Sequence, residues 1–317
     1  MQFELAPMEG VTTWIYRAAY HRHFAPAVRY FTPFIAPNMN KGLNTRERND
    51  VLPEHNKGQA LIPQILTNRA DYFLTTCRDL AELGYDEVNL NLGCPSGTVV
   101  SKGKGSGFLT HPEELERFLD EIFEACPLKI SIKTRVGRTD EAEWPRLLEL
   151  YRRYPCTELI IHPRIQKDFY RGTPRMETFE LALEHAPWPV VYNGDLFTRS
   201  DLEAFQTKYP QLDTVMVGRG ILCNPWLMGG TPDKAVLAKF HEELFEGYRG
   251  VLFGDGPVLC KMKGVWTYMI QLFTNYRPYQ KIIRKTRHLS EYQGTVQSLF
   301  HNEDLIPDTG YDPEARG

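Results

Sequence analysis

The residues best suited to chemistry in this chain of 317 amino acids lie within one stretch, residues 88–107. An alternating apolar run ends at Leu92, Cys94 follows two residues later, and a loop rich in glycine and lysine comes next. A thiol of ordinary pKa, ~8.5, is mostly protonated at neutral pH, so Cys94 is suited to act as a general acid. The glycines would let the loop close over a substrate. Taken alone, however, the stretch fits an inert buried cysteine better.

Polar residues also follow other short apolar runs, each at the point where the run ends. In chain order they are Met8 with Glu9, Gln64, Asn91 with Cys94, Lys133 with Arg135, His162 with Arg164, the triplet Asn193, Gly194 and Asp195, and Gly218 with Arg219. Each has an ordinary structural explanation by itself, such as a turn cap, a solvated lysine or a satisfied core histidine. Seven such clusters at equivalent positions indicate that they share one site.

These apolar runs are the predicted strands of the fold. Eight of them occur, at residues 3–6, 29–32, 61–66, 87–92, 129–134, 158–162, 190–193 and 214–218. Amphipathic stretches such as 69–83 and 113–125 lie between them, with apolar residues at the spacing of one helix face. Strands alternating with such helices predict parallel βα units, and eight units predict a (β/α)8 TIM barrel. The alternative is an open doubly wound sheet, which usually has Gly-x-Gly-x-x-Gly after its first strand, where this chain has Ala-Pro-Met-Glu-Gly.

Two parts of the chain depart from this alternation. Residues 34–58 predict a long loop with at most one short helix, because proline, asparagine and charged residues dominate there. After residue 230, helical patterns at 234–248, 258–273 and 279–292 follow one another with no strand between them. We therefore predict two domains, a barrel at residues 1–230 and a small all-helical domain at 231–317.

The predicted site lies at the C-terminal ends of the strands, where barrels of this class carry their active sites. The loops after strands seven and eight often bind phosphate in such barrels, and here they contain three glycines and one arginine: Gly194, Gly218, Gly220 and Arg219. A phosphorylated cofactor across the barrel mouth is the resulting hypothesis. Lys133 and Gln64 could hydrogen-bond a flat heteroaromatic ring there, which favours a flavin over a sugar phosphate.

One stretch of the chain is strongly basic, although the chain as a whole is not. The formal net charge is -3, so the chain as a whole is not a basic nucleic-acid binder. Residues 261–287, however, contain seven lysines and arginines and no acid, with tyrosines and a tryptophan among them. This stretch predicts contact with RNA phosphates, and a solvated helix face is its ordinary alternative.

Several classes of protein are not supported by the sequence. The six cysteines form no Cys-x-x-Cys motif, so no metal site is expected. We find no signal peptide and no apolar run near the ~20 residues of a membrane span. We therefore expect a cytoplasmic protein with reduced thiols, no membrane contact and a monomeric state.

The motifs identified so far resemble those of the tRNA-dihydrouridine synthases, FMN-dependent enzymes that reduce uridine in tRNA with NADPH or NADH. The resemblance covers nearly the whole chain. It rests on residues 6–12 (Ala-Pro-Met-Glu-Gly-Val-Thr), 91–95 (Asn-Leu-Gly-Cys-Pro) with Gly105 and Ser106, 133–137, 162–164, 193–195, 217–220 and the basic stretch 283–289. The chain departs from the family pattern at Thr13, Pro33, Asn89, Pro163 and Ile165.

The resemblance implies a role for individual residues. FMN would be surrounded by Pro7, Met8, Glu9, Gln64, Lys133, His162, Asn193, Gly194, Asp195, Gly218 and Arg219. Cys94 would donate the proton to the uracil, and Asn91 would help to place the base. Lys133, His162 and Arg164 are the candidate donors for the charge that develops on the uracil carbonyls. The RNA would be bound by Lys102, Arg164, Lys281, Arg284, Lys285 and Arg287.

Two other functions fit parts of the pattern. A flavin-dependent dehydrogenase of a free pyrimidine, of the dihydroorotate type, would use the same barrel but would need no basic helical domain. A non-catalytic RNA-binding module would need the helices but not Cys94, Lys133 and His162. Activity on free bases would favour the first alternative, and a colourless purified protein would favour the second.

Overall fold

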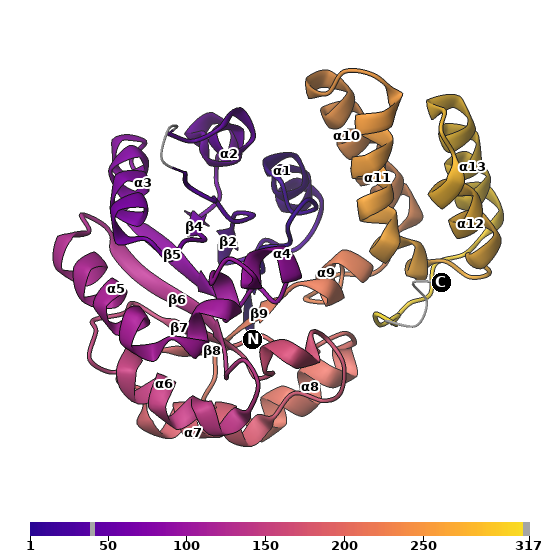
Figure 1. The fold of residues 1–317 in the computed structure, drawn as a ribbon. Helices are drawn as coiled ribbons and strands as arrows, with labels where there is room; N and C mark the ends of the chain where they lie inside the picture. The colour runs from indigo at the N-terminus through magenta and orange to yellow at the C-terminus, as the bar shows by residue number, and fades with distance from the viewer. Residues whose placement is uncertain (39–41, 313–317) are drawn as a thin grey trace.

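The computed structural model describes residues 1–38 and 42–312 and shows a barrel of strands beside a bundle of helices (Figure 1). The strands are β1 (Gln2–Leu5), β2 (Arg29–Phe31), β3 (Leu61–Ile62), β4 (Gln64–Ile65), β5 (Glu87–Leu92), β6 (Lys129–Arg135), β7 (Leu159–His162), β8 (Val190–Tyr192) and β9 (Thr214–Val217). They pair in parallel in the order β3-β2-β1-β9-β8-β7-β6-β5-β4. All eight predicted strand regions are confirmed.

The third predicted strand, 61–66, closes the barrel. Pro63 divides it into β3, which pairs with β2, and β4, which pairs with β5. This one strand therefore joins both ends of the sheet. Proline has no N–H to donate, but the Pro63 carbonyl still accepts a hydrogen bond from the Asn89 N–H at 2.8 Å. The closure confirms the barrel and excludes the open doubly wound sheet.

Helices surround the barrel (Figure 1). They are α1 (Trp14–His23), α2 (Thr45–Val51), α3 (Ala70–Glu82), α5 (Pro112–Ala125), α6 (Trp144–Tyr151), α7 (Met176–His185) and α8 (Arg199–Lys208), with the short α4 (Gly97–Val100) and α9 (Arg219–Cys223). In α5, Pro112 occupies the first turn, where its missing N–H costs nothing, and two glutamates follow near the positive end of the helix dipole. Its predicted apolar face is buried: Leu115, Phe118, Leu119 and Ile122.

The described residues of the long connection after β2 contain one short α-helix, as predicted, and a single 3-10 turn at Pro53–His55. Helix α2 has seven residues and begins with a capping box, in which Asn44 accepts from the Glu47 N–H and the Glu47 carboxylate accepts from the Asn44 N–H. Residues 39–41 of this connection lie outside the described part of the chain.

Four helices follow the barrel: α10 (Lys234–Val251), α11 (Asp255–Met269), α12 (Arg277–Lys285) and α13 (Leu289–Asn302). The prediction of a single helix over 279–292 is wrong, because the chain leaves the helical conformation at Thr286 (ψ 146°). The Thr286 carbonyl accepts from Lys263 Nζ at 2.6 Å, and its hydroxyl donates to Glu291. These tertiary bonds separate α12 from α13.

The helical bundle packs directly on the barrel. Tyr16 of α1 meets Phe240 of α10 edge to face, with ring centroids 5.6 Å apart. Thr13 Oγ1 and Tyr248 Oη lie 2.9 Å apart across the same contact. Lys261 Nζ of α11 donates to the Gly10 carbonyl at 3.1 Å, so this helix reaches the loop that follows β1.

Candidate active site

A cavity of about 360 Å³ opens at the C-terminal ends of the strands. The predicted residues that line it are Pro7, Met8, Glu9, Gln64, Asn91, Cys94, Lys133, His162, Asn193, Gly194, Gly218 and Arg219. They come from seven strands, β1 and β4 to β9, and the loops that follow them. The structure thus brings these residues together, as the sequence pattern predicts.

A chain of side-chain amides fixes the strand ends below Cys94. Asn91 Nδ2 donates to Gln64 Oε1 at 2.7 Å, and Gln64 Nε2 donates to Asn89 Oδ1 at 2.8 Å. Asn91 Oδ1 in turn accepts from the Gly93 and Cys94 N–H groups at 3.0 and 2.9 Å. Asn91 therefore holds the turn that presents Cys94.

The loop after Cys94 is folded back onto the cysteine. The Cys94 carbonyl accepts from both the Ser106 hydroxyl, at 2.8 Å, and the Ser106 N–H, at 3.2 Å. Gly105 precedes Ser106 with φ +56°, and a Cβ there would lie 2.9 Å from the Cys94 oxygen. Only glycine fits this approach without displacing the backbone. Burial raises the pKa of the Cys94 thiol, so the thiol holds its proton at neutral pH.

Two basic side chains of the cavity, Lys133 and His162, have lowered pKa values. Burial, with Arg135 nearby, lowers the pKa of Lys133 to about 7, and Lys133 Nζ donates to Asn193 Oδ1 at 2.6 Å. Burial and the surrounding cations lower the pKa of His162 well below its usual range. An anionic ligand in the cavity would oppose both shifts by favouring the charged forms.

Arg164 lies beneath the cavity rather than at the surface. Its side chain is fully buried, and its guanidinium forms an ion pair with Asp195 at 2.5 Å. Arg164 Nη1 also lies 3.1 Å from His162 Nε2, and because a guanidinium only donates, this nitrogen must accept. His162 thus carries its proton on Nδ1. The prediction that Arg164 contacts RNA is corrected by this burial, since an RNA phosphate cannot reach it.

Asp195 does not itself line the cavity, and its expected contact with the cofactor stays a prediction. Its carboxylate bonds to Arg219, which does line the cavity. Arg219 Nη2 donates to Asp195 Oδ1 at 2.7 Å, so one carboxylate holds both Arg164 and Arg219. Asp195 is therefore positioned to orient Arg219.

Two glycines shape the wall next to Arg219. A Cβ on Gly194 would lie 1.9 Å from the Tyr192 hydroxyl, and one on Gly218 would lie 3.2 Å from the Ala6 Cβ. Any larger residue would push into this wall or into the cavity. The glycines after strands β8 and β9 thus keep space at the place where a phosphate was predicted.

Sequence reasoning missed some of the cavity wall. Phe34, Phe169 and Tyr170 line the cavity, and Arg135, noted only as a strand-end residue, does so as well. The aromatic residues lie in irregular segments after β2 and β7, where no periodicity distinguishes them. The strand-end position of Arg135 was the one signal available.

The predicted RNA-binding residues other than Arg164 lie elsewhere on the surface. Lys281, Arg284 and Lys285 are exposed on α12, which has no acidic residue, and Arg287 is exposed just after it. Lys102 is exposed on the loop that follows Cys94. None of these five side chains is among those lining the cavity.

A closed parallel barrel with a cavity lined by basic side chains at the C-terminal ends of its strands is the architecture of TIM-barrel enzymes, which place their active sites there. Residues 4–303 match the family model described as dihydrouridine synthase (Dus), and the chain belongs to this family. Its members are flavin-dependent oxidoreductases. No helix in residues 1–38 and 42–312 is long and apolar enough to cross a membrane.

Curated relatives carry matching names. The chain is 31% identical over 261 residues to a probable tRNA-dihydrouridine synthase of Staphylococcus epidermidis, covering 78% of each chain. It is 30% identical over 260 residues to that of Staphylococcus aureus, and 28% identical over 260 residues to probable tRNA-dihydrouridine synthase 2 of Bacillus subtilis, again covering 78% of each chain. Among solved structures, N-(5'-phosphoribosyl)anthranilate isomerase from Pyrococcus furiosus aligns with a TM-score of 0.42 and 14% identity over 70% of this chain and 89% of its own.

Proposed function

We propose that this enzyme reduces specific uridines of tRNA to 5,6-dihydrouridine, with FMN in the barrel mouth and NADPH, or NADH, as the reductant. The observation that carries the proposal is the shared cavity of Cys94, Lys133 and His162, in which a protonated thiol lies among buried nitrogen donors. Family membership supports the same activity and disfavours both a free pyrimidine as substrate and a non-catalytic RNA-binding role.

The cavity fits a flavin phosphate. Gln64, Lys133 and Asn193 offer amide and amine groups for the polar edge of a flat ring, and Met8 offers an apolar wall. Arg219 and the space kept open by Gly194 and Gly218 suit the phosphate. The excess of positive charge in this buried region also favours an anion.

The residues of the chain would divide the remaining chemistry. When bound, FMN supplies the hydride for C6 of the uracil, and NADPH restores it. The negative charge that then develops on the uracil is stabilised by Lys133 and by the Nδ1–H of His162. Cys94 gives its proton to C5, and its raised pKa keeps that proton available at neutral pH. Asn91 positions Cys94 through its two backbone hydrogen bonds.

The tRNA would be held outside the cavity. A uridine stacked in a helix cannot reach the Cys94 thiol in the cavity, so the base must turn out of its stack. The exposed cations Lys281, Arg284, Lys285 and Arg287 on and after α12, with Lys102 on the loop after Cys94, would bind backbone phosphates. The contact between Lys261 and Gly10 joins α11 to the loop beside Glu9, which lines the cavity.

A direct test combines cofactor content and product formation. The purified protein should contain FMN that NADPH bleaches without oxygen, and it should convert uridine to dihydrouridine in a tRNA transcript, measured by mass spectrometry of the digested RNA. Arg219→Glu should remove the FMN by placing a negative charge beside the phosphate. The same change at Arg146, which is 67% exposed on α6, should leave FMN content at the parent level. A protein that cannot be loaded with FMN, or that leaves every tRNA uridine intact, would refute the proposal.

A further inference from the structure

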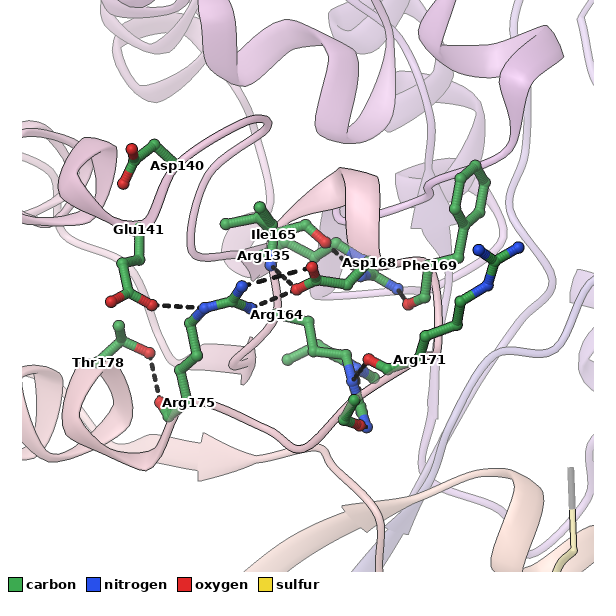
Figure 2. A network of polar contacts seen from close by, with 12 residues as sticks. Arg135, Asp140, Glu141, Arg164, Ile165, Asp168, Phe169, Arg171, Arg175 and Thr178 are labelled. Atoms are coloured by element: carbon green, nitrogen blue, oxygen red, sulfur yellow. Dashed lines mark hydrogen bonds and ion pairs between the residues drawn. The ribbon is translucent and has the colours of Figure 1, made fainter.

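The segment after β7, residues 165–172, forms an arch at the cavity mouth, here called the mouth arch. Figure 2 shows the arginines that hold it. Arg135 donates to the carbonyls of Ile165 and Phe169, at 2.9 and 2.6 Å. Arg164 donates to two further carbonyls near its end. The backbone of the arch is thus fixed from the strand ends below it.

A third arginine holds the arch from the side. Arg175 forms ion pairs with Asp168 and with Glu141, the second at 2.5 Å, and Asp168 also accepts from the Ile165 N–H at 3.1 Å (Figure 2). Because these bonds are made by charged groups, they are stronger than ordinary amide hydrogen bonds. The arch therefore has little freedom to relax.

The fixed backbone holds Phe169 in a conformation that suits glycine. The Arg171 N–H bonds to the Asp168 carbonyl at 2.8 Å, and Phe169 is the second residue of the turn between them, with φ 53° and ψ −96°. These angles are near those of the second position of a type II′ turn, which is dominated by glycine. Strain of this kind in a residue with a side chain is concentrated at functional sites.

The two aromatic rings of the arch have different surroundings. The Tyr170 ring forms cation–π contacts within the protein: the guanidinium carbons of Arg219 and Arg135 lie 4.5 and 5.4 Å from its centroid. Phe169 is 43% exposed and lines the cavity, and its ring contacts no aromatic ring or cation within residues 1–38 and 42–312. Its ring points away from the arginine network (Figure 2).

We propose that Phe169 is a stacking platform for a nucleobase of the bound tRNA. A rigid arch holds an apolar ring at the rim of the cavity at a cost in backbone strain, and in the described part of the chain no aromatic ring or cation packs on it. A base that loses its neighbour when the uridine turns out would regain stacking on this ring, as bases do on aromatic side chains of RNA-binding proteins. This inference rests on the proposed function, because it takes tRNA as the substrate.

Because the backbone at Phe169 suits glycine, the ring can be removed without destabilising the fold. Phe169→Gly removes the ring while relieving the strain, so its melting temperature should equal or exceed that of the parent protein. Its affinity for tRNA, compared at equal FMN content, should fall about 5- to 150-fold, which is the usual worth of one aromatic–base stack. Phe169→Trp and Phe169→Tyr should retain the parent affinity, and Phe169→Leu should not. The salt dependence should be unchanged, since no phosphate contact is lost.

Two results would overturn the inference: Phe169→Gly binding tRNA as tightly as the parent, or the tryptophan and tyrosine variants binding as weakly as the glycine variant. Arg175→Ala serves as a control for loosening of the arch, because it keeps the ring, and a loss as large as that of Phe169→Gly would also count against stacking. Affinity is measured without turnover. A parent protein that binds tRNA but forms no dihydrouridine would therefore contradict the proposed function and leave this comparison intact.

Discussion

The two ends of the barrel differ in their ionisable groups: basic side chains predominate at one end and carboxyl groups at the other. At the C-terminal end, Lys133, Arg135 and Arg219 surround the cavity, and Asp195 bonds to Arg219 from beneath it. Near the N-terminal end, three carboxylates, Glu4, Glu87 and Glu158, surround the single guanidinium of Arg29.

At both ends of the barrel, the pKa shifts favour the uncharged form of the buried groups. Burial and neighbouring cations lower the pKa of Lys133 to about 7 at the mouth. Burial and neighbouring carboxylates raise the pKa of Glu158 to about 8 at the other end, and burial also raises that of Glu4. The mouth opens into a cavity that can admit a compensating anion, whereas the carboxylate cluster forms its ion pairs with Arg29 inside the protein. The C-terminal end of the barrel is thus suited to ligand binding and catalysis, and the N-terminal end to stabilising the packing of the strands.

The largest effect is expected from the thiol at the mouth. Cys94→Ala should still bind FMN and accept hydride from NADPH, because neither step uses the proton for uracil C5. Dihydrouridine formation should fall by a factor of ~10²–10⁴, the usual worth of a positioned general acid. Stopped-flow flavin reduction and product counting in tRNA separate the two steps.

The matched control is Cys260→Ala, since Cys260 is an exposed thiol on α11. It should leave both steps at the parent rate. If Cys94→Ala makes dihydrouridine at the parent rate, the acid lies elsewhere and Cys94 is a structural thiol.

At the opposite end, the loss should be in stability rather than in catalysis. Arg29→Met leaves Glu4 and Glu158 buried without their cation, which should lower the free energy of unfolding by about 3–5 kcal/mol. Denaturant unfolding measures this, and FMN bound per folded molecule should stay unchanged. Arg146→Met, which breaks an exposed ion pair with Glu113, should leave the unfolding midpoint nearly unchanged. Equal midpoints for the two variants would show that the cluster does not hold the strands.

The exposed cations of the helical bundle should affect tRNA binding, and neither catalysis nor stability. Replacing Arg284, Lys285 and Arg287 by alanine should weaken tRNA binding by roughly 10- to 100-fold near physiological salt and make its salt dependence less steep, by about one unit of slope per lost phosphate contact. The control replaces Arg146, Arg152 and Arg153 of the α6 region, which have similar exposure on the barrel. Unchanged tRNA affinity in the first variant would indicate only a solvated helix face.

The smallest effect is a pH dependence at the carboxylate end. The pKa of Glu158 is higher in the folded protein, about 8, than the ordinary value of 4.5, so the folded state binds more protons between these values. Stability should therefore be greatest below pH 4.5 as far as this group is concerned, and should fall as the pH rises toward 8. Glu158→Gln should reduce this fall by roughly 1–2 kcal/mol between pH 5 and 8, measured by denaturant unfolding. A steeper fall in the variant would contradict the assignment.

Much of the barrel and of its mouth could be predicted because the signals are local. The strands, the face of α5 and the polar residues at the strand ends each depend on a few consecutive residues, and parallel pairing then brings equivalent strand ends to one edge. Position in the strand was a reliable guide for Gln64 and Lys133, but it did not distinguish Arg219, which lines the cavity, from Asp195, which lies beneath it.

What the sequence by itself determined is the set of elements, the chemistry at the strand ends, and the basic character of the helical part. The tertiary structure decided the closure at Pro63, the burial of Arg164, the break at Thr286, the exposed ring of Phe169 and the grouping of Glu4 with Glu158. These features join residues far apart in the chain, and they depend on barrel register and loop path. Side-chain periodicity does not encode either of these, because it reports only which face of its own element a residue occupies.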